Sequence, residues 1–412
     1  MVKKIERCRV CKNSNLIPVL DLGEQYLTGT FPKIKDLLLT KGPLRLVKCH
    51  GEDGCCGLLQ LEHSYDADEM YGENYGYRSG LNSSMVNHLH NKVEKILSIV
   101  NLKEDDLVID IGSNDGTTLG FYPDSLTLIG VDPTANKFKE FYKPHVNFHA
   151  DFFSSNLIKN NYSKKVKVIT SFSMLYDLED PMSFVKQISQ ILAHDGIWVF
   201  EQSYLPLMLR QNSFDTVCHE HIEYYGLHQI KWILEKSGLK ILDVELNDIN
   251  GGSFSVTACL EDCDTYVRST NVDDYLEDEV KSGLMGIEPY KEFARNTEQA
   301  LLNMRNFIDN KISEGKKIYA LGASTKGNVF LQYCGITDDE VEAIGEVNPE
   351  KFGCFSPGSW IKIMDENEVL ASNPDYLIVL PWHFRNFFLD SPKFKGHTLV
   401  FPLPELEIIK VS

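Results

Sequence analysis

The chain has no run that approaches the ~18 consecutive apolar residues of a membrane-spanning helix. Its first residues, MVKKIERCRVC, also lack the apolar core of a secretory signal. Positive charge is scarce too, because 41 Lys and Arg face 59 Asp and Glu, which gives a net charge of −18. A nucleic-acid partner would need a basic face. We therefore expect a cytoplasmic protein that neither enters membranes nor binds nucleic acid.

Half of the ten cysteines lie in the first 56 residues. Because disulfides are rare in a reducing compartment, clustered cysteines favour a metal. Cys8 and Cys11 form a C-x-x-C pair, and a second group follows at Cys49, Cys55 and Cys56. Four thiolates can close a tetrahedral site, for which zinc is the usual occupant. We expect Cys56 as the fourth ligand, since a glycine follows it in a tight turn, and Cys55 as the spare. The alternatives are a histidine ligand or unligated buried thiols.

With 412 residues, 43% of them apolar, the chain has room for two or three domains. From about 81 to 265, apolar residues at helical spacing alternate with continuous apolar strands, and an Asn-Gly-Gly turn indicates an antiparallel hairpin. The expected strands lie at 106–112, 126–133, 165–175 and 196–204, followed by the hairpin at 239–260. This pattern is typical of a mostly parallel sheet with helices on both faces.

A second α/β unit follows a charged segment at 271–283, which we interpret as a linker. A long amphipathic helix is expected at 288–315, and strands are expected at 316–323, 341–348, 375–382 and 397–403. We therefore predict an α/β protein with a cysteine-rich domain at 1–80, a central domain at 81–268 and a carboxyl-terminal domain at 269–412.

The turn after the first central strand reads VIDIGSNDGTT. In an open α/β sheet, a glycine turn at the carboxyl end of a strand lets a ligand approach the backbone. This turn lacks the G-x-G-x-x-G spacing of a dinucleotide site, and its carboxylates disfavour a diphosphate. S-adenosylmethionine, which has a positive sulfonium and no phosphate, fits better. We expect a helix directly after the turn. The candidate cofactor residues in it are Asp110, Gly112, Asn114, Asp115 and Gly116.

Two further carboxylates extend this site along the sheet edge. Asp132 ends the next strand, twenty residues beyond Gly112, where it can accept hydrogen bonds from both ribose hydroxyls. Asp151, which Phe152 follows, can face the adenine amine. The glycine turn is weak evidence alone, and the three features in this order strengthen the prediction of an S-adenosylmethionine site.

The carboxyl-terminal unit has its own glycine-containing loop, LGASTKGN. It can present backbone amides, hydroxyls and one cation to a phosphate group. It lacks the Walker spacing, which argues against a nucleoside triphosphatase. The segment LPWHFR lies at the same kind of strand end, although a plain strand-to-helix connection with a solvated lysine is the alternative. The candidate ligand residues are Ser324, Lys326, Asn328, Trp382, His383 and Arg385.

Titratable groups are densest in DTVCHEHIEYYGL, residues 215–227. The metalloprotease pattern H-E-x-x-H fails because Glu223 occupies the position of its second histidine. On a strand or extended loop, His219 and His221 share a side. An imidazole with a pKa of about 6.5 is suited to removing a proton, and the adjacent Glu220 could fix its tautomer. We interpret the cluster as a proton-transfer site, with an ordinary polar loop as the alternative.

A glycine-rich loop at 71–80, YGENYGYRSG, carries three tyrosines and Arg78. Such a polar aromatic loop is typical of a lid over a binding site, and a surface turn is the alternative. Its candidate residues are Tyr75, Tyr77 and Arg78.

Together these segments resemble the nucleotide-sugar C-methyltransferases, from Cys8 to about Phe401. The motifs that carry the resemblance are CxxC, GYRSG, VIDIGSNDGT, DTVCHEH, NDINGGSFSV, GASTKGN, EVNPEKFG and LPWHFR. It implies a zinc-binding amino-terminal domain, a central class I methyltransferase domain that binds S-adenosylmethionine, and a carboxyl-terminal Rossmann-like domain. The implied substrate is a nucleoside diphosphate 4-keto-6-deoxysugar between the last two domains, methylated next to its ketone, at C-3′, through an enolate. We also expect a monomer.

The resemblance assigns roles to single residues. His221 matches the family's proposed base, with Glu220 beside it, and Tyr77 matches a tyrosine that faces the reacting sugar. We expect His219 to help stabilise the enolate oxygen. The expected sugar contacts are Tyr75, Arg78, Asp177 and Tyr224.

This sequence departs from the family at two positions. Cys218 stands where some members have tyrosine, and Asp177 stands where some have histidine. Both departures leave open whether the sugar bears a 3-amino or a 3-hydroxyl group.

Three other functions fit part of the pattern. An O- or N-methyltransferase acting on a nucleotide-sugar shares the cofactor fold and needs no enolising base. A nucleotide-sugar dehydrogenase would need the absent G-x-G-x-x-G motif. A non-catalytic, zinc-stabilised binding protein would have no use for the intact set of Gly112, Asp115 and Asp132.

Overall fold

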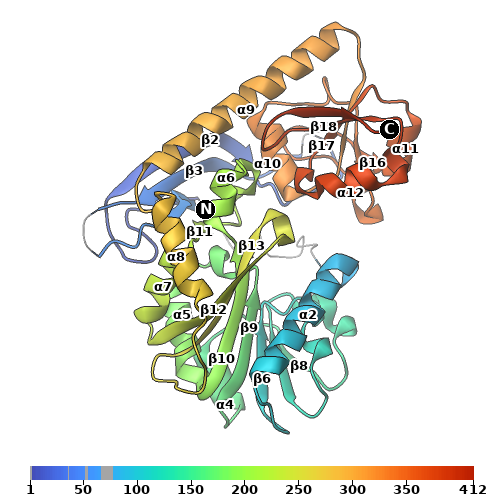
Figure 1. Cartoon of the computed structure of the whole chain (residues 1–412). Coiled ribbons are helices and arrows are strands. Elements are labelled where there is room, and N and C mark those ends of the chain that lie inside the picture. The colour runs from blue at the N-terminus through green and yellow to red at the C-terminus, as the bar shows by residue number, and fades with distance from the viewer. Residues whose placement is uncertain (1, 36, 52–53, 66–77) are drawn as a thin grey trace.

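Three large sheets organise the chain, one in each part that the sequence predicts (Figure 1). The computed structural model describes residues 2–35, 37–51, 54–65 and 78–412. The predicted α/β class, with two Rossmann-like units behind a small cysteine-rich unit, is confirmed. None of the helices in these ranges is long and apolar enough to cross a membrane.

The amino-terminal part is built on a four-stranded antiparallel sheet in the order β11-β4-β3-β2. Its strands are β2 (Leu16–Tyr26), β3 (Lys41–Cys49), β4 (Leu59–Leu61) and β11 (Glu223–Tyr224), and β1 (Lys3–Lys4) pairs with β5 (His63–Ser64) as a separate ribbon. Because β11 comes from the middle of the chain, this sheet is completed by a segment that follows the histidine cluster.

The central part is a seven-stranded sheet in the order β12-β13-β10-β9-β6-β7-β8, parallel except for β13. Its strands are β6 (Leu107–Ile111), β7 (Thr127–Val131), β8 (Asn147–His149), β9 (Val166–Phe172), β10 (Leu192–Ser203), β12 (Leu239–Asn247) and β13 (Ser253–Leu260). Its helices are α2 (Ser83–Ile99), α3 (Ala135–Phe138), α4 (Ser155–Asn161), α5 (Pro181–Ile191), α6 (Leu205–Arg210), α7 (Leu227–Glu235) and α8 (Asn271–Lys281). The predicted hairpin is β12 and β13.

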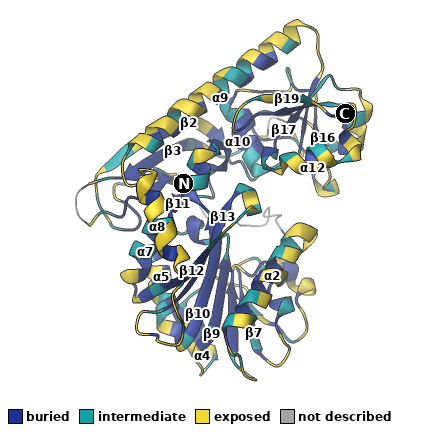
Figure 2. Cartoon of the chain, in the orientation of Figure 1, coloured by how far each residue is buried: buried dark blue, intermediate teal, exposed yellow. Residues whose placement is uncertain are grey.

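Helices cover both faces of this sheet. Side chains alternate between the two faces along each strand, and because successive residues of the central strands are mostly apolar, both faces must be buried. Val108 of β6 lies in one buried cluster with Val93 of α2, while its neighbour Ile109 lies in the opposite cluster with Ile188 of α5. Figure 2 shows the result, a buried sheet between helices whose outer faces are exposed.

Two secondary-structure predictions in this region were wrong. The turn after β6 does not open a helix but continues as turns up to a short 3-10 helix, η2 (Leu119–Phe121), because Asn114 and Gly116 adopt left-handed conformations. The predicted linker at 271–283 is mostly the helix α8. Its buried Glu279 accepts hydrogen bonds from the backbone N–H groups of Leu227 and His228 at the start of α7. The domain boundary that we propose at 268/269 therefore precedes a helix packed on the central part.

The carboxyl-terminal part has a six-stranded sheet in the order β16-β15-β14-β17-β18-β19, with only β19 antiparallel. Its strands are β14 (Ile318–Leu321), β15 (Ile344–Glu346), β16 (Ile363–Asp365), β17 (Tyr376–Val379), β18 (Thr398–Phe401) and β19 (Glu407–Lys410). Its helices are α9 (Glu288–Ser313), α10 (Thr325–Tyr333), α11 (Glu366–Ala371) and α12 (Arg385–Asp390). The long helix α9 runs from the amino-terminal sheet to this one (Figure 1).

Candidate active site

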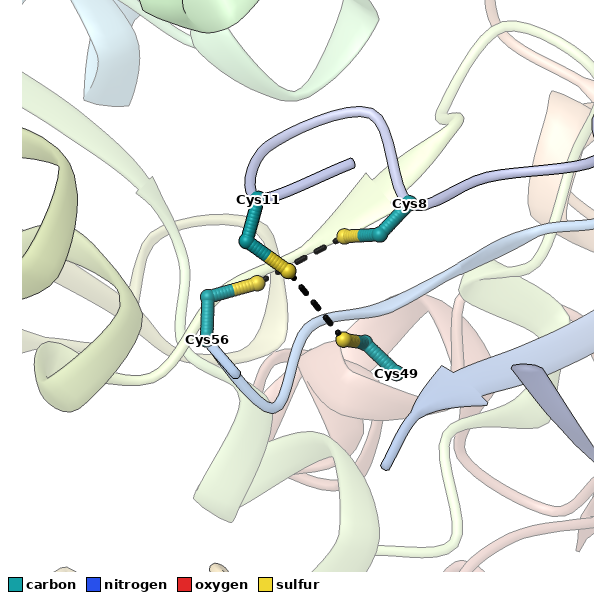
Figure 3. Close-up of side chains that lie close together, drawn as sticks. All are labelled: Cys8, Cys11, Cys49 and Cys56. Atoms are coloured by element: carbon teal, nitrogen blue, oxygen red, sulfur yellow. Dashed lines mark hydrogen bonds between the residues drawn. The ribbon is translucent and has the colours of Figure 1, made fainter. Parts of the chain in front are cut away.

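The four predicted cysteine ligands come together (Figure 3). The Sγ atoms of Cys8 and Cys56 are 3.5 Å apart, those of Cys11 and Cys49 are 3.4 Å apart, and all four lie within 4.8 Å of one another. A tetrahedral site with Zn–S bonds of about 2.3 Å has sulfur–sulfur edges of about 3.8 Å. The cluster therefore fits zinc. Cys55 lies outside this group, with its Sγ 3.7 Å from the carbonyl oxygen of Gly51, and we propose that it is the spare.

The glycine turn after β6 is a compact arrangement of carboxylates. Asp132, at the end of β7, accepts a hydrogen bond from the backbone N–H of Asn114 at 2.8 Å, which ties the two strand ends together. Asp110 accepts one from the hydroxyl of Thr170 at 2.6 Å. Burial first, and then the nearby carboxylates of Asp132 and Asp115, raise the pKa of Asp110 to about 7, although hydrogen bonds from Thr170 and Thr118 lower it. Negative charge thus gathers at this edge of the sheet, where a sulfonium would be stabilised.

The close approach of the turn to the sheet depends on glycine. Gly116 has φ 75°, and a Cβ at this position would lie 2.8 Å from the ring of Tyr142. Asp151 and Phe152 follow β8 at the same carboxyl edge, and both are exposed. The fold thus brings the predicted cofactor residues to one edge of the central sheet.

The end of the tyrosine-rich loop is attached to this turn. The backbone N–H of Ser79 donates to Asn114 Oδ1 at 3.0 Å, and that of Gly80 donates to Asp115 Oδ2 at 2.9 Å. Arg78 lies with its Nε 3.6 Å from the same Asp115 oxygen, and its guanidinium stacks on Phe141. Of the predicted lid residues, Tyr75 and Tyr77 lie outside the described residues.

His221 is held in a defined tautomer. Its Nδ1 lies 3.2 Å from the carbonyl oxygen of Thr216, in the short helix η5 (Phe214–Thr216). A carbonyl can only accept, so Nδ1 carries the hydrogen and Nε2 is the basic nitrogen. The ring packs edge-on against Tyr176 and lines a cavity with room for about one water molecule. Burial, reinforced by the charge of Lys326, lowers the pKa of His221 to about 4, so the imidazole is neutral at pH 7.

The neighbours of His221 point elsewhere. His219 is fully buried, with Nε2 3.4 Å from the carbonyl oxygen of Gly42 and its ring edge-on to Tyr65. The Glu220 carboxylate packs on the amino-terminal part, where a Cβ at Gly29 would lie 2.3 Å from its Oε1. The two histidines therefore do not share surroundings, and a backbone carbonyl takes the tautomer-fixing role expected of Glu220.

Tyr224 and Asp177 both lie next to the loop that carries Cys218 and His221. The Tyr224 hydroxyl donates to the backbone carbonyl of His221 at 2.8 Å, so it holds the loop. Asp177, in η4 (Leu175–Asp177), lies near Cys218. The pKa of the Cys218 thiol is raised by burial first and then by the carboxylates of Glu220 and Asp177.

Lys326 brings the carboxyl-terminal loop to the central part. Its Nζ donates to the carbonyl oxygen of Asn250, in the β12–β13 turn, at 2.7 Å. Burial lowers the pKa of His383 to about 3, and the charge of Lys326 adds to this effect. Ser324 caps α10 by accepting from the N–H of Gly327 at 3.1 Å. The charge of Lys326 also acts on His221, whose pKa it helps to lower.

Three other predicted ligand residues form hydrogen bonds or an ion pair within the protein, two of them with other parts of the chain. Asn328 donates to the Thr28 carbonyl at 2.7 Å, and Trp382 Nε1 donates to Asp215 Oδ2 at 2.8 Å. Arg385 instead pairs with Glu407 of β19 at 2.8 Å. The contributions of Thr216 and Asn250 could not be predicted from the sequence, because they are made by backbone carbonyls, which leave no mark in a sequence pattern.

Comparison with known proteins matches each part of the chain. A zinc binding domain model covers residues 8–71, a methyltransferase domain model covers 85–244, and a C-methyltransferase C-terminal domain model covers 248–404. The C-methyltransferase NovU of Streptomyces niveus is 29% identical over 423 positions, which span 100% of this chain and 99% of NovU. The chain is an S-adenosylmethionine-dependent methyltransferase that is similar along its whole length to a C-methyltransferase.

Solved methyltransferase structures match less than half of this chain. An S-adenosylmethionine-dependent methyltransferase from Clostridium acetobutylicum ATCC 824 is 15% identical, with a TM-score of 0.32 over 42% of this chain and 92% of that protein. Magnesium protoporphyrin IX methyltransferase (ChlM) from Synechocystis PCC 6803 is 13% identical, with a TM-score of 0.32 over 46% of this chain and 88% of that protein.

The cofactors of the methyltransferase follow from the matched domain models and its donor sets. S-adenosylmethionine is the methyl donor, and zinc is the metal of the four-cysteine cluster. We propose that Asp132 receives the ribose hydroxyls, that Asp151 and Phe152 border the adenine, and that the carboxylates around Gly112 face the sulfonium.

Proposed function

We propose that this methyltransferase methylates the carbon next to the ketone, C-3′, of a nucleoside diphosphate 4-keto-6-deoxysugar. His221 is the base that forms the enolate. The observation that carries this proposal is the tautomer of His221, because the hydrogen bond from Nδ1 to Thr216 makes Nε2 the proton acceptor. A methyltransferase that acts on oxygen or nitrogen needs no enolising base, so exchange of the hydrogen next to the ketone distinguishes the two classes.

The chemistry uses few groups. Nε2 of His221 removes the proton next to the ketone, the electron pair of the broken C–H bond forms the C=C bond of an enolate, and the π pair of the C=O bond moves onto the oxygen. S-adenosylmethionine supplies a methyl group on a positively charged sulfur. That methyl group would pass to the enolate carbon as the new C–C bond, and the electron pair of the S–CH₃ bond would stay on sulfur. The protein contributes alignment and the placement of charge around the enolate oxygen.

Lys326 supports a phosphorylated substrate. Its Nζ lies at the meeting point of the carboxyl-terminal loop and the β12–β13 turn, where burial lowers its pKa and a bound anion would favour its charged form. A sugar diphosphate bound across the last two parts would place its anion near this charge and its sugar toward His221.

The decisive experiment follows the substrate's own hydrogen. In deuterium oxide, with S-adenosylhomocysteine in place of the methyl donor, the wild-type protein should exchange the hydrogen next to the ketone of the nucleotide-sugar, as observed by proton NMR. With the methyl donor present, carbon NMR should show a new carbon–carbon bond. An O- or N-methyl product without any exchange would refute the proposal.

Lys326 and Arg385 provide a matched pair of variants for substrate binding. Lys326→Ala should raise KM for the nucleotide-sugar by about tenfold, the size of one charge-assisted hydrogen bond. Arg385→Ala should change KM much less, because its guanidinium pairs with Glu407. Both variants should bind S-adenosylmethionine with wild-type affinity in calorimetry. A larger effect from Arg385 would move the diphosphate toward α12.

A further inference from the structure

The zinc-bearing module and the catalytic loop share one sheet. Gln60 and Leu59 of β4 pair with Glu223 and Tyr224 of β11, and β11 begins two residues after His221. The backbone N–H of Leu61 also donates to the carbonyl oxygen of Ile222 at 2.9 Å. The backbone that follows the base is therefore held by β4 on one side.

β4 is in turn clamped by a residue between two metal ligands. Arg9 lies between Cys8 and Cys11 and is buried, although it carries a charge. Its backbone N–H donates to Gln60 Oε1 at 3.0 Å, and its guanidinium donates to the Leu61 carbonyl at 2.7 Å. The same guanidinium also reaches the carbonyl of His63 and the hydroxyl of Ser64. A buried guanidinium with this many partners fixes its neighbours in one geometry.

The chain of contacts reaches the base through Tyr224. This buried residue of β11 donates its hydroxyl hydrogen to the His221 carbonyl at 2.8 Å. On the opposite side, the N–H of Ile222 donates to the Tyr176 carbonyl at 3.0 Å, and the Tyr176 ring packs against the imidazole. A continuous series of hydrogen bonds and strand pairs therefore connects the C-x-x-C turn at 8–11, which we call the zinc knuckle, to the loop that holds His221.

We propose that Arg9 and Tyr224 are positioning residues, through which the zinc knuckle sets the orientation of the His221 imidazole by way of β4 and β11. This inference rests on the proposed role of His221 as the base. It makes the metal module part of the proton-transfer apparatus, although no cysteine ligand comes near the substrate.

The first test compares two arginines at the zinc knuckle. Arg9→Gln should lower the rate of substrate hydrogen exchange by about ten- to a hundredfold, because small displacements of a reacting group cost rates of this order. It should retain about one zinc per chain and wild-type affinity for S-adenosylmethionine. The control is Arg7→Gln, since Arg7 is exposed and, within the described part of the chain, its side chain donates a hydrogen bond only to the carbonyl of Lys12. Equal exchange rates for the two variants would overturn the proposal.

The second test remains decisive if Arg9→Gln fails to fold. Tyr224→Phe removes one hydroxyl and should slow exchange by about three- to tenfold, the size of one hydrogen bond. Its control is Tyr266→Phe, which removes a comparable bond to the Asp195 carbonyl at 2.7 Å, away from the loop. Nitrogen-15 NMR of the His221 ring, assigned with a His221→Asn sample, should show the Nδ1–H tautomer in wild type and a mixture in Tyr224→Phe. A wild-type rate and tautomer in Tyr224→Phe would overturn the proposal, whereas absence of exchange in the wild type would refute the proposed function itself.

Discussion

Cys56→Ser protein should purify with far less than one zinc per chain, whereas Cys55→Ser protein should retain about one. The four sulfurs of Cys8, Cys11, Cys49 and Cys56 lie within 4.8 Å of one another, and Cys55 contacts Gly51 instead. Structural zinc binds with apparent free energies of about 10–16 kcal/mol in small domains, so the loss of one thiolate removes a large share of the stability of the module. Elemental analysis of protein prepared without chelators measures the zinc directly.

The two adjacent cysteines make this comparison well controlled. Both substitutions replace a thiol by a hydroxyl in the same loop, so a difference between them reports ligation rather than local disturbance. Thermal unfolding should show a lowered midpoint only for Cys56→Ser. If Cys55→Ser lost the metal and Cys56→Ser kept it, the ligand assignment would be reversed.

Features set by short-range spacing could be predicted from the sequence. The C-x-x-C pair and the later cysteines predict a cluster, and the glycine after Cys56 favours the one of two neighbours whose sulfur lies with the other three. Strands of continuous apolar residues also stand out, since both faces of a parallel strand are buried. The glycine turn and Asp132 follow from strand ends that meet at one edge of the sheet.

Features set by contacts between distant segments could not be predicted. The segment at 271–283 reads as a charged linker, yet the buried carboxylate of Glu279 caps α7 and fixes it as a helix. Likewise, the alternation of side chains along a strand predicts that His219 and His221 lie on one side. In the structure, His219 is instead buried against the amino-terminal part, where it contacts Gly42 and Tyr65. A two-residue strand such as β11 is also too short to carry a periodic pattern.

His221→Asn should lower kcat by about 10²–10⁴-fold, the usual contribution of a general base, while both ligands bind as in the wild type. Asparagine keeps a donor for the Thr216 carbonyl but has no basic nitrogen, so the loop should stay in place while proton removal stops. The matched control is His228→Asn, because the Nδ1 of His228 contacts Glu279 outside the cavity. In steady-state kinetics, this control should retain wild-type kcat.

The pH dependence and the exchange reaction sharpen the assignment of His221. With its pKa lowered to about 4 by burial and by Lys326, His221 is already neutral well below pH 6. Its protonation should therefore leave kcat/KM unchanged between about pH 6 and 8, whereas an unperturbed imidazole would lose half its activity near pH 6.5. Lys326→Ala removes the nearby positive charge, so the acid limb of the kcat/KM profile should move to higher pH.

His221→Asn should not exchange the substrate hydrogen in deuterium oxide. Exchange at the wild-type rate would show that another group is the base.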